Sequence, residues 1–172
     1  MSTSPSHKEH KTHAPKSVAC MVITCSDTRT PDTDTSGQLI QTLLKEKGHS
    51  VAAYHLVKDE PEQIKARIAE GTGNDQIQAI IINGGTGISR RDSTFEAVDG
   101  MLEKRLDGFG EVFRFLTYQE IGSAAIMSRA TAGIIKGRVL FSTPGSENAV
   151  RLAMDKLILP ELGHLVKELT KE

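Results

Sequence analysis

The sequence contains no tryptophan, and aromatic residues make up only 4% of its 172 residues. Proteins that stack nucleic-acid bases rely on aromatic side chains, so this scarcity argues against a base-stacking surface. The formal net charge is −1, which gives no general attraction to polyanions. We therefore expect no nucleic-acid partner, and any anion must be bound by a local site.

Long apolar runs and paired cysteines are also missing. No stretch approaches the roughly 20 apolar residues that span a bilayer, and no apolar core of a signal peptide is visible. The two cysteines, Cys20 and Cys25, lie in one predicted strand at an odd separation, so their side chains point to opposite faces. A disulfide between them would have poor geometry, which favours free buried thiols in a reducing compartment. These features predict a cytoplasmic protein without a membrane segment.

The remaining composition is typical of a soluble globular domain, with 38% hydrophobic and 25% charged residues. Residues 1–16 are polar and lack an apolar period, so we interpret them as a flexible tail. His7, His10 and His13 recur in this tail at a spacing that allows a metal site, although a solvated tail is the simpler interpretation. Residues 17–172 contain no linker or repeat and are expected to form a single domain.

Apolar runs alternate with segments of helical periodicity along this domain. Strands are predicted at Val18–Thr24, Val51–Val57, Ala79–Ile82 and Val139–Phe141. Residues 108–135 are expected to be helical and loop-like, and Pro160 is expected to end the helix that follows Ser146. This rhythm predicts an α/β fold with a mostly parallel central sheet between helices.

Small, polar or glycine-rich segments follow each predicted strand. In parallel sheets, ligands bind outside the carboxyl ends of the strands, so these loops should converge on one edge. The four loops are Ser26-Asp27, Asp59, Gly84-Gly85-Thr86-Gly87 and Pro144-Gly145-Ser146.

The glycine run is the strongest candidate for an anion site. Glycines let backbone N–H groups approach a phosphate closely, and Ser93 with Glu96 forms a capping-box pattern for a following helix. The run matches neither a Walker loop nor a dinucleotide fingerprint. Arg91, next to the run, can neutralise phosphate charge, whereas a plain tight turn and a solvated basic loop are the alternatives.

Two aspartates carry a second interpretation. Asp59 can cap the helix that starts at Pro61, and Asp92 can favour the helix that starts near Ser93. Paired carboxylates beside a phosphate site also suit magnesium-dependent phosphoryl or nucleotidyl transfer. No set of serine, cysteine and histidine offers a competing nucleophile.

Two further segments add candidates. Ser146 is expected to cap a helix, and its loop can lend N–H groups to an anion. Ser128 and Arg129 lie in the small-residue segment 123–132, which permits either close packing or space for a flat ligand.

With these residues in place, the chain resembles the molybdenum cofactor biosynthesis protein B family, which is close to molybdopterin adenylyltransferases and gephyrin-like domains. The resemblance spans about residues 18–166. The matching segments are Thr24–Arg29, Lys58-Asp59-Glu60, Gly84–Gly87, Arg91–Thr94, Glu96-Ala97, Gly108–Glu111, Ser128-Arg129-Ala130 and Pro144-Gly145-Ser146.

The resemblance implies a three-layer, molybdopterin-binding α/β fold that assembles as a homotrimer or homohexamer, and it leaves open other enzymes of the same pathway as partners. It also implies binding of molybdopterin and its adenylylation with Mg²⁺-ATP, with release of pyrophosphate. Asp59 and Asp92 match the essential aspartates and would also hold Mg²⁺. The substrate and nucleotide would contact Ser26, Asp27, Gly84, Gly85, Thr86, Gly87, Arg91, Ser128, Arg129, Pro144, Gly145 and Ser146.

Three other functions remain open from the sequence. The first is a non-catalytic molybdopterin-binding or carrier protein of the same pathway. The second is a nucleotide-binding or pyrophosphate-cleaving protein with another substrate, which rests on fold analogy alone. The third is a structural assembly module.

Overall fold

The computed structural model describes residues 15–170. The predicted tail with its three histidines lies outside the described residues, except for its last two positions. The described chain forms one six-stranded sheet in the order β2-β1-β3-β6-β5-β4. The strands are β1 (Ala19–Cys25), β2 (Ser50–Val57), β3 (Ala79–Asn83), β4 (Lys104–Arg105), β5 (Thr131–Ile135) and β6 (Arg138–Thr143).

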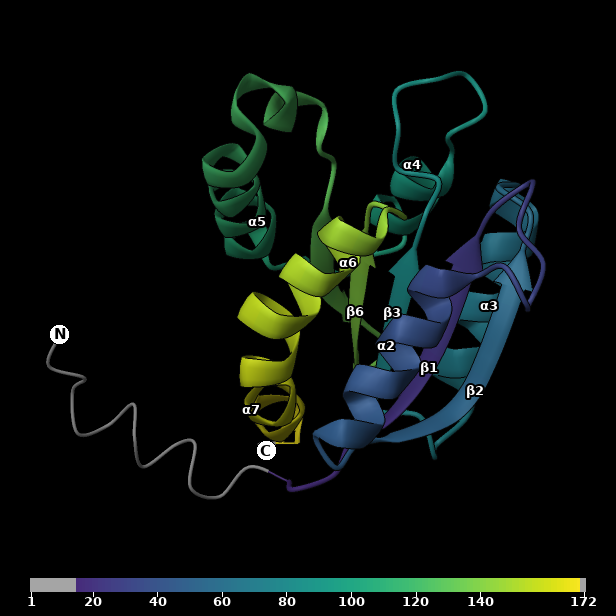
Figure 1. The fold of residues 1–172 in the computed structure, drawn as a ribbon. Helices are drawn as coiled ribbons and strands as arrows, with labels where there is room; N and C mark the ends of the chain where they lie inside the picture. The colour runs from purple at the N-terminus through teal and green to yellow at the C-terminus, as the bar shows by residue number, and fades with distance from the viewer. Residues whose placement is uncertain (1–14, 171–172) are drawn as a thin grey trace, which may run out of the picture.

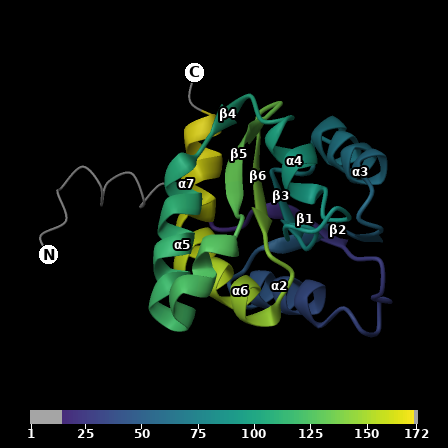
Figure 2. The same ribbon diagram turned by 90° about the horizontal axis from the view of Figure 1, so that it is seen from above.

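Helices cover both faces of the sheet, which confirms the predicted three-layer α/β architecture (Figures 1 and 2). One face carries α2 (Thr35–Glu46), α5 (Asp107–Ile121), α6 (Glu147–Ala153) and α7 (Leu159–Leu169). The other face carries α3 (Pro61–Gly73) and α4 (Thr94–Asp99). Two 3₁₀ or π-helical segments, η1 (Gly122–Met127) and η2 (Met154–Ile158), complete the described chain.

Strand β1 shows why the sheet has two cores. It is buried on both faces, and alternate side chains enter different clusters: Cys20 and Val22 pack toward α2, whereas Ile23 and Cys25 pack toward α3. A continuous apolar run is therefore what a central parallel strand requires. Both cysteines are buried and free, as predicted.

The prediction for residues 108–135 was wrong in its last part, because β5 lies there. Strands β5 and β6 form an antiparallel hairpin whose two turn residues, Lys136 and Gly137, both have positive φ, 45° and 71°. This backbone is typical of a type I′ turn, which joins twisted strands closely. The short β4 adds a second antiparallel pairing, so the sheet has a parallel β2-β1-β3-β6 part and an antiparallel edge.

The predicted break at Pro160 was also wrong. The helical path continues from α6 through η2 into α7, and Pro160 lies in the first turn of α7. A proline in a helix interior lacks the N–H of one backbone hydrogen bond. In η2 the hydrogen bonds run from residue i+5 to residue i, as from Leu159 N to Met154 O, so carbonyls in this turn need not rely on the missing Pro160 N–H.

Candidate functional site

The loops at the carboxyl ends of β1, β3 and β6 surround one cavity of about 500 Å³. The convergence expected from the sequence is therefore correct for three of the four loops, and Asp59 of the fourth lies behind the glycine run. The close approach of two loops requires glycine, because a Cβ at Gly145 would lie 2.9 Å from Gly84 Cα. The lining consists of Cys25, Ser26, Thr28, Arg29, Gly84, Gly85, Thr86, Gly87, Asp92, Ile121, Ala124, Met127, Ser128, Pro144, Gly145 and Ser146.

The glycine run has a backbone that only glycine adopts easily. Gly84 and Gly85 have φ of +96° and +62°, and a Cβ at Gly84 would lie 2.1 Å from the carbonyl oxygen of Cys25. The backbone N–H groups of residues 85–88 donate to no acceptor within residues 15–170. Consecutive unpaired N–H groups beside a cavity are typical of anion-binding loops.

Asp59 is buried and organises the start of α4. Its Oδ1 accepts hydrogen bonds from Ser93 N (3.1 Å), Ser93 Oγ (2.9 Å) and Thr94 Oγ1 (3.1 Å). The predicted capping box is therefore wrong, because the Ser93 hydroxyl binds Asp59 and makes no cap hydrogen bond in α4. Asp59 does not cap α3 either, since Glu60 occupies that N-cap position.

Asp92 lies at the cavity, directly against the glycine run. Its Oδ2 accepts hydrogen bonds from Ser89 N (3.0 Å) and Ser89 Oγ (2.5 Å). A Cβ at Gly87 would lie 2.6 Å from the same oxygen, so the absence of a side chain there makes room for the carboxylate. The Oδ1 atom of Asp92 and the Oδ2 atom of Asp59 have no hydrogen-bond partner in the described part of the chain.

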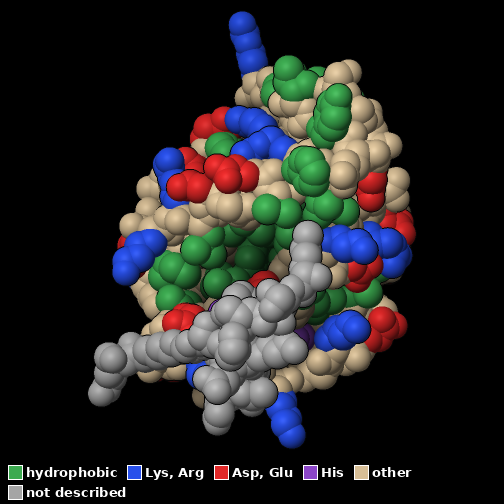
Figure 3. All heavy atoms as spheres, turned by 90° about the vertical axis from the view of Figure 1, so that its left-hand side faces the viewer, with side chains coloured by type: hydrophobic (Ala, Val, Ile, Leu, Met, Phe, Trp, Pro, Cys, Tyr) green, Lys and Arg blue, Asp and Glu red, His purple; other side chains and the backbone are tan. Residues whose placement is uncertain are grey.

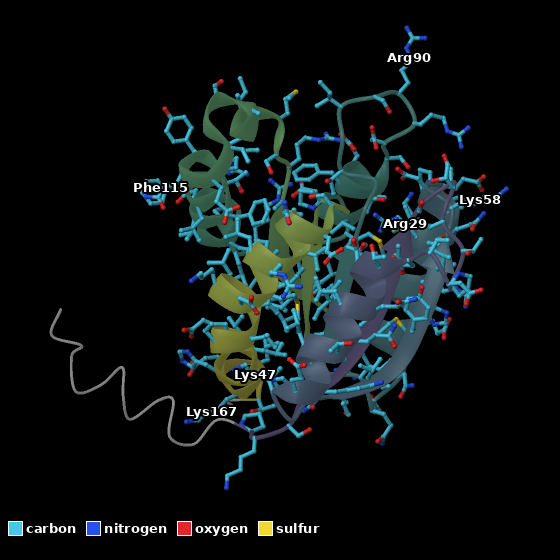
Figure 4. The ribbon with its side chains drawn as sticks, in the orientation of Figure 1. Arg29, Lys47, Lys58, Arg90, Phe115 and Lys167 are labelled. Atoms are coloured by element: carbon cyan, nitrogen blue, oxygen red, sulfur yellow. The ribbon has the colours of Figure 1, made fainter. Side chains whose placement is uncertain are left out.

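Asp27 and Arg91 pair with each other outside the cavity lining. Arg91 Nη2 donates to Asp27 Oδ2 at 2.7 Å, and Asp27 Oδ1 accepts from the backbone N–H of Asp59 at 3.3 Å. The pair therefore joins the loop after β1 to the loop before α4. Arg90 points away from the protein at the tip of the same loop (Figure 4).

Ser128 lines the cavity, but Arg129 does not. The Arg129 guanidinium donates from Nε to Thr86 O (2.8 Å) and from Nη2 to Gly87 O, and it pairs with the Glu96 carboxylate. It also lies 4.9 Å from the centre of the Phe95 ring. The guanidinium lowers the pKa of Glu96. The structure thus places Arg129 behind the glycine run.

Arg29 is a cavity residue that the sequence reasoning did not select. It donates from Nη2 to Gly145 O (2.9 Å) and from Nη1 to the fully buried Asp34 (3.2 Å). Asp34 also accepts from Tyr54 Oη at 2.7 Å. The signal was its place within the loop that follows β1, close to Ser26 and Asp27. At the same edge, the Ser146 hydroxyl caps α6 by accepting from Ala149 N at 3.3 Å, as predicted.

The wall opposite the glycine run is apolar and was also missed. Ile121, Ala124 and Met127 line it, and Ile121 and Met127 are 58% and 54% exposed. These residues come from the end of α5 and from η1, in the segment whose fold was only partly predicted. The cavity therefore combines a backbone N–H face with an apolar face, which suits a phosphorylated ligand with a flat ring.

The chemistry available to the cavity excludes a thiolate nucleophile. Burial raises the pKa of Cys25 to about 12, so this thiol is neutral at physiological pH. Among residues 15–170, no group of three or more histidine, cysteine, aspartate or glutamate side chains could hold a metal by itself. Two carboxylates with ligand phosphates are, however, a usual Mg²⁺ environment.

No helix in the described range is long and apolar enough to cross a membrane.

Residues 21–164 match a family described as a probable molybdopterin binding domain. The chain is 55% identical to molybdenum cofactor biosynthesis protein B of Bacillus subtilis (strain 168) over 166 residues, which is 96% of this chain and 98% of the relative. It is 47% identical to the protein of the same name from Staphylococcus carnosus (strain TM300), covering 91% and 93% of the two chains.

Solved structures agree with these relatives. A crystal structure of a molybdenum cofactor biosynthesis protein B superposes with a TM-score of 0.90 at 53% identity, covering 93% of this chain and all of the other. The tungsten cofactor synthesizing protein MoaB from Pyrococcus furiosus gives a TM-score of 0.83 at 37% identity, with 92% and 100% covered. The chain belongs to the molybdenum cofactor biosynthesis protein B family.

Proposed function

We propose that this protein acts in molybdenum cofactor biosynthesis, where it binds molybdopterin and adenylylates its terminal phosphate with ATP. The observation that carries the proposal is the cavity itself, whose lining joins the unpaired amides of Gly85, Thr86 and Gly87 to the Asp92 carboxylate, with the Asp59 carboxylate behind the glycine run. In the proposed reaction, the terminal phosphate of the pterin attacks the α-phosphate of ATP, and pyrophosphate leaves. No covalent enzyme intermediate is needed, which agrees with a neutral Cys25.

The residues present fit a magnesium ion held together with the nucleotide. Asp59 Oδ2 and Asp92 Oδ1 are the carboxylate oxygens that no other described group engages. Mg²⁺ is usually bound by one or two carboxylates plus phosphate oxygens, and it would neutralise charge on the transferring group. The N–H groups of the glycine run and the Arg29 guanidinium would fix the phosphates, because both already border the cavity.

The proposal is tested by pyrophosphate release from ATP in the presence of molybdopterin. An Asp92→Asn variant should lose about 100-fold or more in rate while it keeps its fold, because Asp92 is half-buried at the cavity and caps no helix. A matched Asp75→Asn variant, at a fully exposed side chain, should retain wild-type activity. An Asp92→Asn enzyme with full rate would contradict the aspartate role.

A second candidate is a non-catalytic molybdopterin carrier of the same pathway. One observation favours it: Arg29 lines the cavity, but the two arginines that were expected at the ligand, Arg91 and Arg129, contact other protein groups. Fewer cations at the cavity mean weaker stabilisation of a pentavalent phosphorus transition state. Tight molybdopterin binding without any pyrophosphate release would support the carrier over the enzyme.

We also propose that the protein is a homo-oligomer, either a trimer or a hexamer. Its support is an apolar surface on α5 and η1, which faces the viewer in Figure 3. Phe115, Tyr118 and Ile126 are 60%, 60% and 82% exposed on this surface. Monomeric proteins seldom expose apolar side chains in such a group. Light scattering should give a molecular mass of three or six times the 18.7 kDa of one chain. The Phe115→Asp substitution should shift this mass toward that of a single chain.

A further inference from the structure

The backbone N–H groups of residues 85–88 are four consecutive donors in and directly after the glycine run. Their direction depends on contacts that hold the peptide planes in place. Gly85, Thr86 and Gly87 line the cavity, and neither their N–H groups nor that of Ile88 has an acceptor within the described chain. Glycine-rich backbone is free to rotate its peptide planes, which would spread these donors over many directions. A phosphate site gains affinity when its donors are already oriented.

Arg129 contacts the outer side of this run with almost all of its hydrogen-bonding capacity. Four of the five guanidinium N–H groups are used, on Thr86 O, on Gly87 O and on both oxygens of Glu96. The side chain is 26% exposed and lies against the Phe95 ring. Glu96 and Phe95 therefore hold the guanidinium in place, and the guanidinium holds two consecutive carbonyls.

Peptide geometry converts this contact into a direction for the donors. The peptide bonds of the described chain are trans, so each C=O points opposite to the N–H of the next residue. Binding of Thr86 O and Gly87 O by Arg129 turns the N–H groups of Gly87 and Ile88 away from Arg129. Arg129 does not line the cavity and Gly87 does, so a Gly87 amide turned away from Arg129 lies on the side from which a ligand in the cavity can reach it, and Ile88 directly follows the lining residues.

We propose that Arg129 is a positioning residue, which acts by orienting the Gly87 and Ile88 amides toward a phosphate group without touching that group. The inference rests on the proposed function, since it assumes a phosphorylated ligand in this cavity. It differs from direct binding, which was expected from the sequence. A direct ligand would need its guanidinium in the cavity, but the N–H groups of Arg129 are directed at the loop and at Glu96.

The test uses the full chain and pyrophosphate as the probe. Arg129→Lys keeps the positive charge but lacks the planar fork that bridges two carbonyls and a carboxylate. Arg129→Gln removes the charge as well. Both variants should bind pyrophosphate about tenfold more weakly by calorimetry. In both, the pyrophosphate-induced NMR shifts of the Gly87 and Ile88 amide protons should be lost. Arg90→Gln, which removes an equal charge from a solvent-directed side chain, should stay within about twofold of wild type (Figure 4).

The possible outcomes separate this inference from the proposed function. If Arg129→Lys binds like wild type and Arg129→Gln does not, Arg129 is a charge-providing ligand and the inference is wrong. Wild-type amide shifts in both variants would also overturn it. If wild type itself fails to bind pyrophosphate or ATP, the proposed function is wrong. Hydrogen exchange of the Gly84, Ser89 and Asp92 amides, which have acceptors in the loop and its neighbours, then still tests the positioning without ligand, since both Arg129 variants should accelerate it and Arg90→Gln should not.

A fourth variant covers the case in which substitution of Arg129 prevents folding. Glu96→Gln keeps Arg129 but replaces the carboxylate that pairs with it by a neutral amide, which weakens the contact. We expect about threefold weaker pyrophosphate binding and smaller Gly87 and Ile88 shifts with an unchanged melting temperature. Unchanged binding and shifts in this variant would contradict the inference.

Discussion

Replacing Gly87 by alanine would put a methyl group where the Asp92 carboxylate now lies. The Cβ would be 2.6 Å from Oδ2 and 2.9 Å from Cγ of Asp92, whereas ordinary contacts begin at 3.4 Å. The carboxylate must therefore move by about 1 Å to reach an ordinary contact distance from the new methyl group. This movement also disturbs the hydrogen bonds that Asp92 accepts from Ser89 N and Oγ.

The expected effect is large on catalysis and small on stability. A displacement of about 1 Å in a catalytic group can cost about 100-fold in rate, so we expect kcat for pyrophosphate release to fall by about that factor. Weakening the two bonds to Ser89 should cost about 1 kcal/mol. Restricting the unfolded chain at this position, where φ is not positive, returns about 0.4–1 kcal/mol. The free energy of unfolding should change by less than about 1 kcal/mol.

The assay pairs steady-state pyrophosphate release with urea unfolding. Gly73→Ala is the control, since a Cβ at Gly73 meets nothing within 4 Å and its rate should not change. A structure of the Gly87→Ala protein should show the Asp92 carboxylate displaced. If the carboxylate is displaced and the rate is still that of wild type, the position of Asp92 does not matter for the reaction and the reasoning is refuted.

Three further predictions concern stability and reactivity. Tyr54→Phe should lower the free energy of unfolding by about 1–2 kcal/mol, because fully buried Asp34 loses a hydrogen-bond donor; a change below about 0.3 kcal/mol in urea unfolding would contradict this. Native Cys25 should resist iodoacetamide at pH 8, where a pKa of about 12 leaves about one thiolate in ten thousand, and mass spectrometry should find it alkylated only in urea. Burial lowers the pKa of His49, whose Nδ1 accepts a hydrogen bond from Val18 N. The stabilisation by neutral His49 is therefore complete above pH 6.5 and disappears as the pH falls toward the lowered pKa. The difference in urea midpoint between wild type and His49→Ala should accordingly shrink on acidification.

The parallel part of the fold could be predicted because its strands are continuous apolar runs. Ala79–Asn83 is buried throughout, and a fully apolar run of this length is typical of a central parallel strand. The antiparallel edge could not, because Thr131–Ile135 begins with small residues that are equally compatible with a loop. Its turn is also unusual, since Lys136 has a positive φ that the sequence gives no reason to expect.

Which loops line the cavity could be predicted from their position after the strands. Which charged side chains point into the cavity could not be predicted. The glycine run and Pro144–Ser146 reach the cavity because the ends of parallel strands meet at one edge, and Ser128 reaches it just before the start of the antiparallel β5. Asp27, Arg91 and Arg129 were also expected at the ligand, but they bind protein groups beside the cavity. Those partners come from distant segments, so no local pattern could identify them.

This difference explains why charged residues near the glycine run need not be ligands. The faces that border the cavity are mainly backbone and small side chains, and backbone donors have no fixed direction unless other groups constrain them. Asp59 fixes the start of α4, and Arg129 fixes the carbonyls of the run. Substitution of Arg129 would therefore change the direction of the amides without removing a group that lines the cavity, whereas substitution of Asp59 would also remove a proposed Mg²⁺ ligand. Measured losses at Arg129 report how well the amides are oriented, and they should differ from losses at Asp92, which faces the cavity directly.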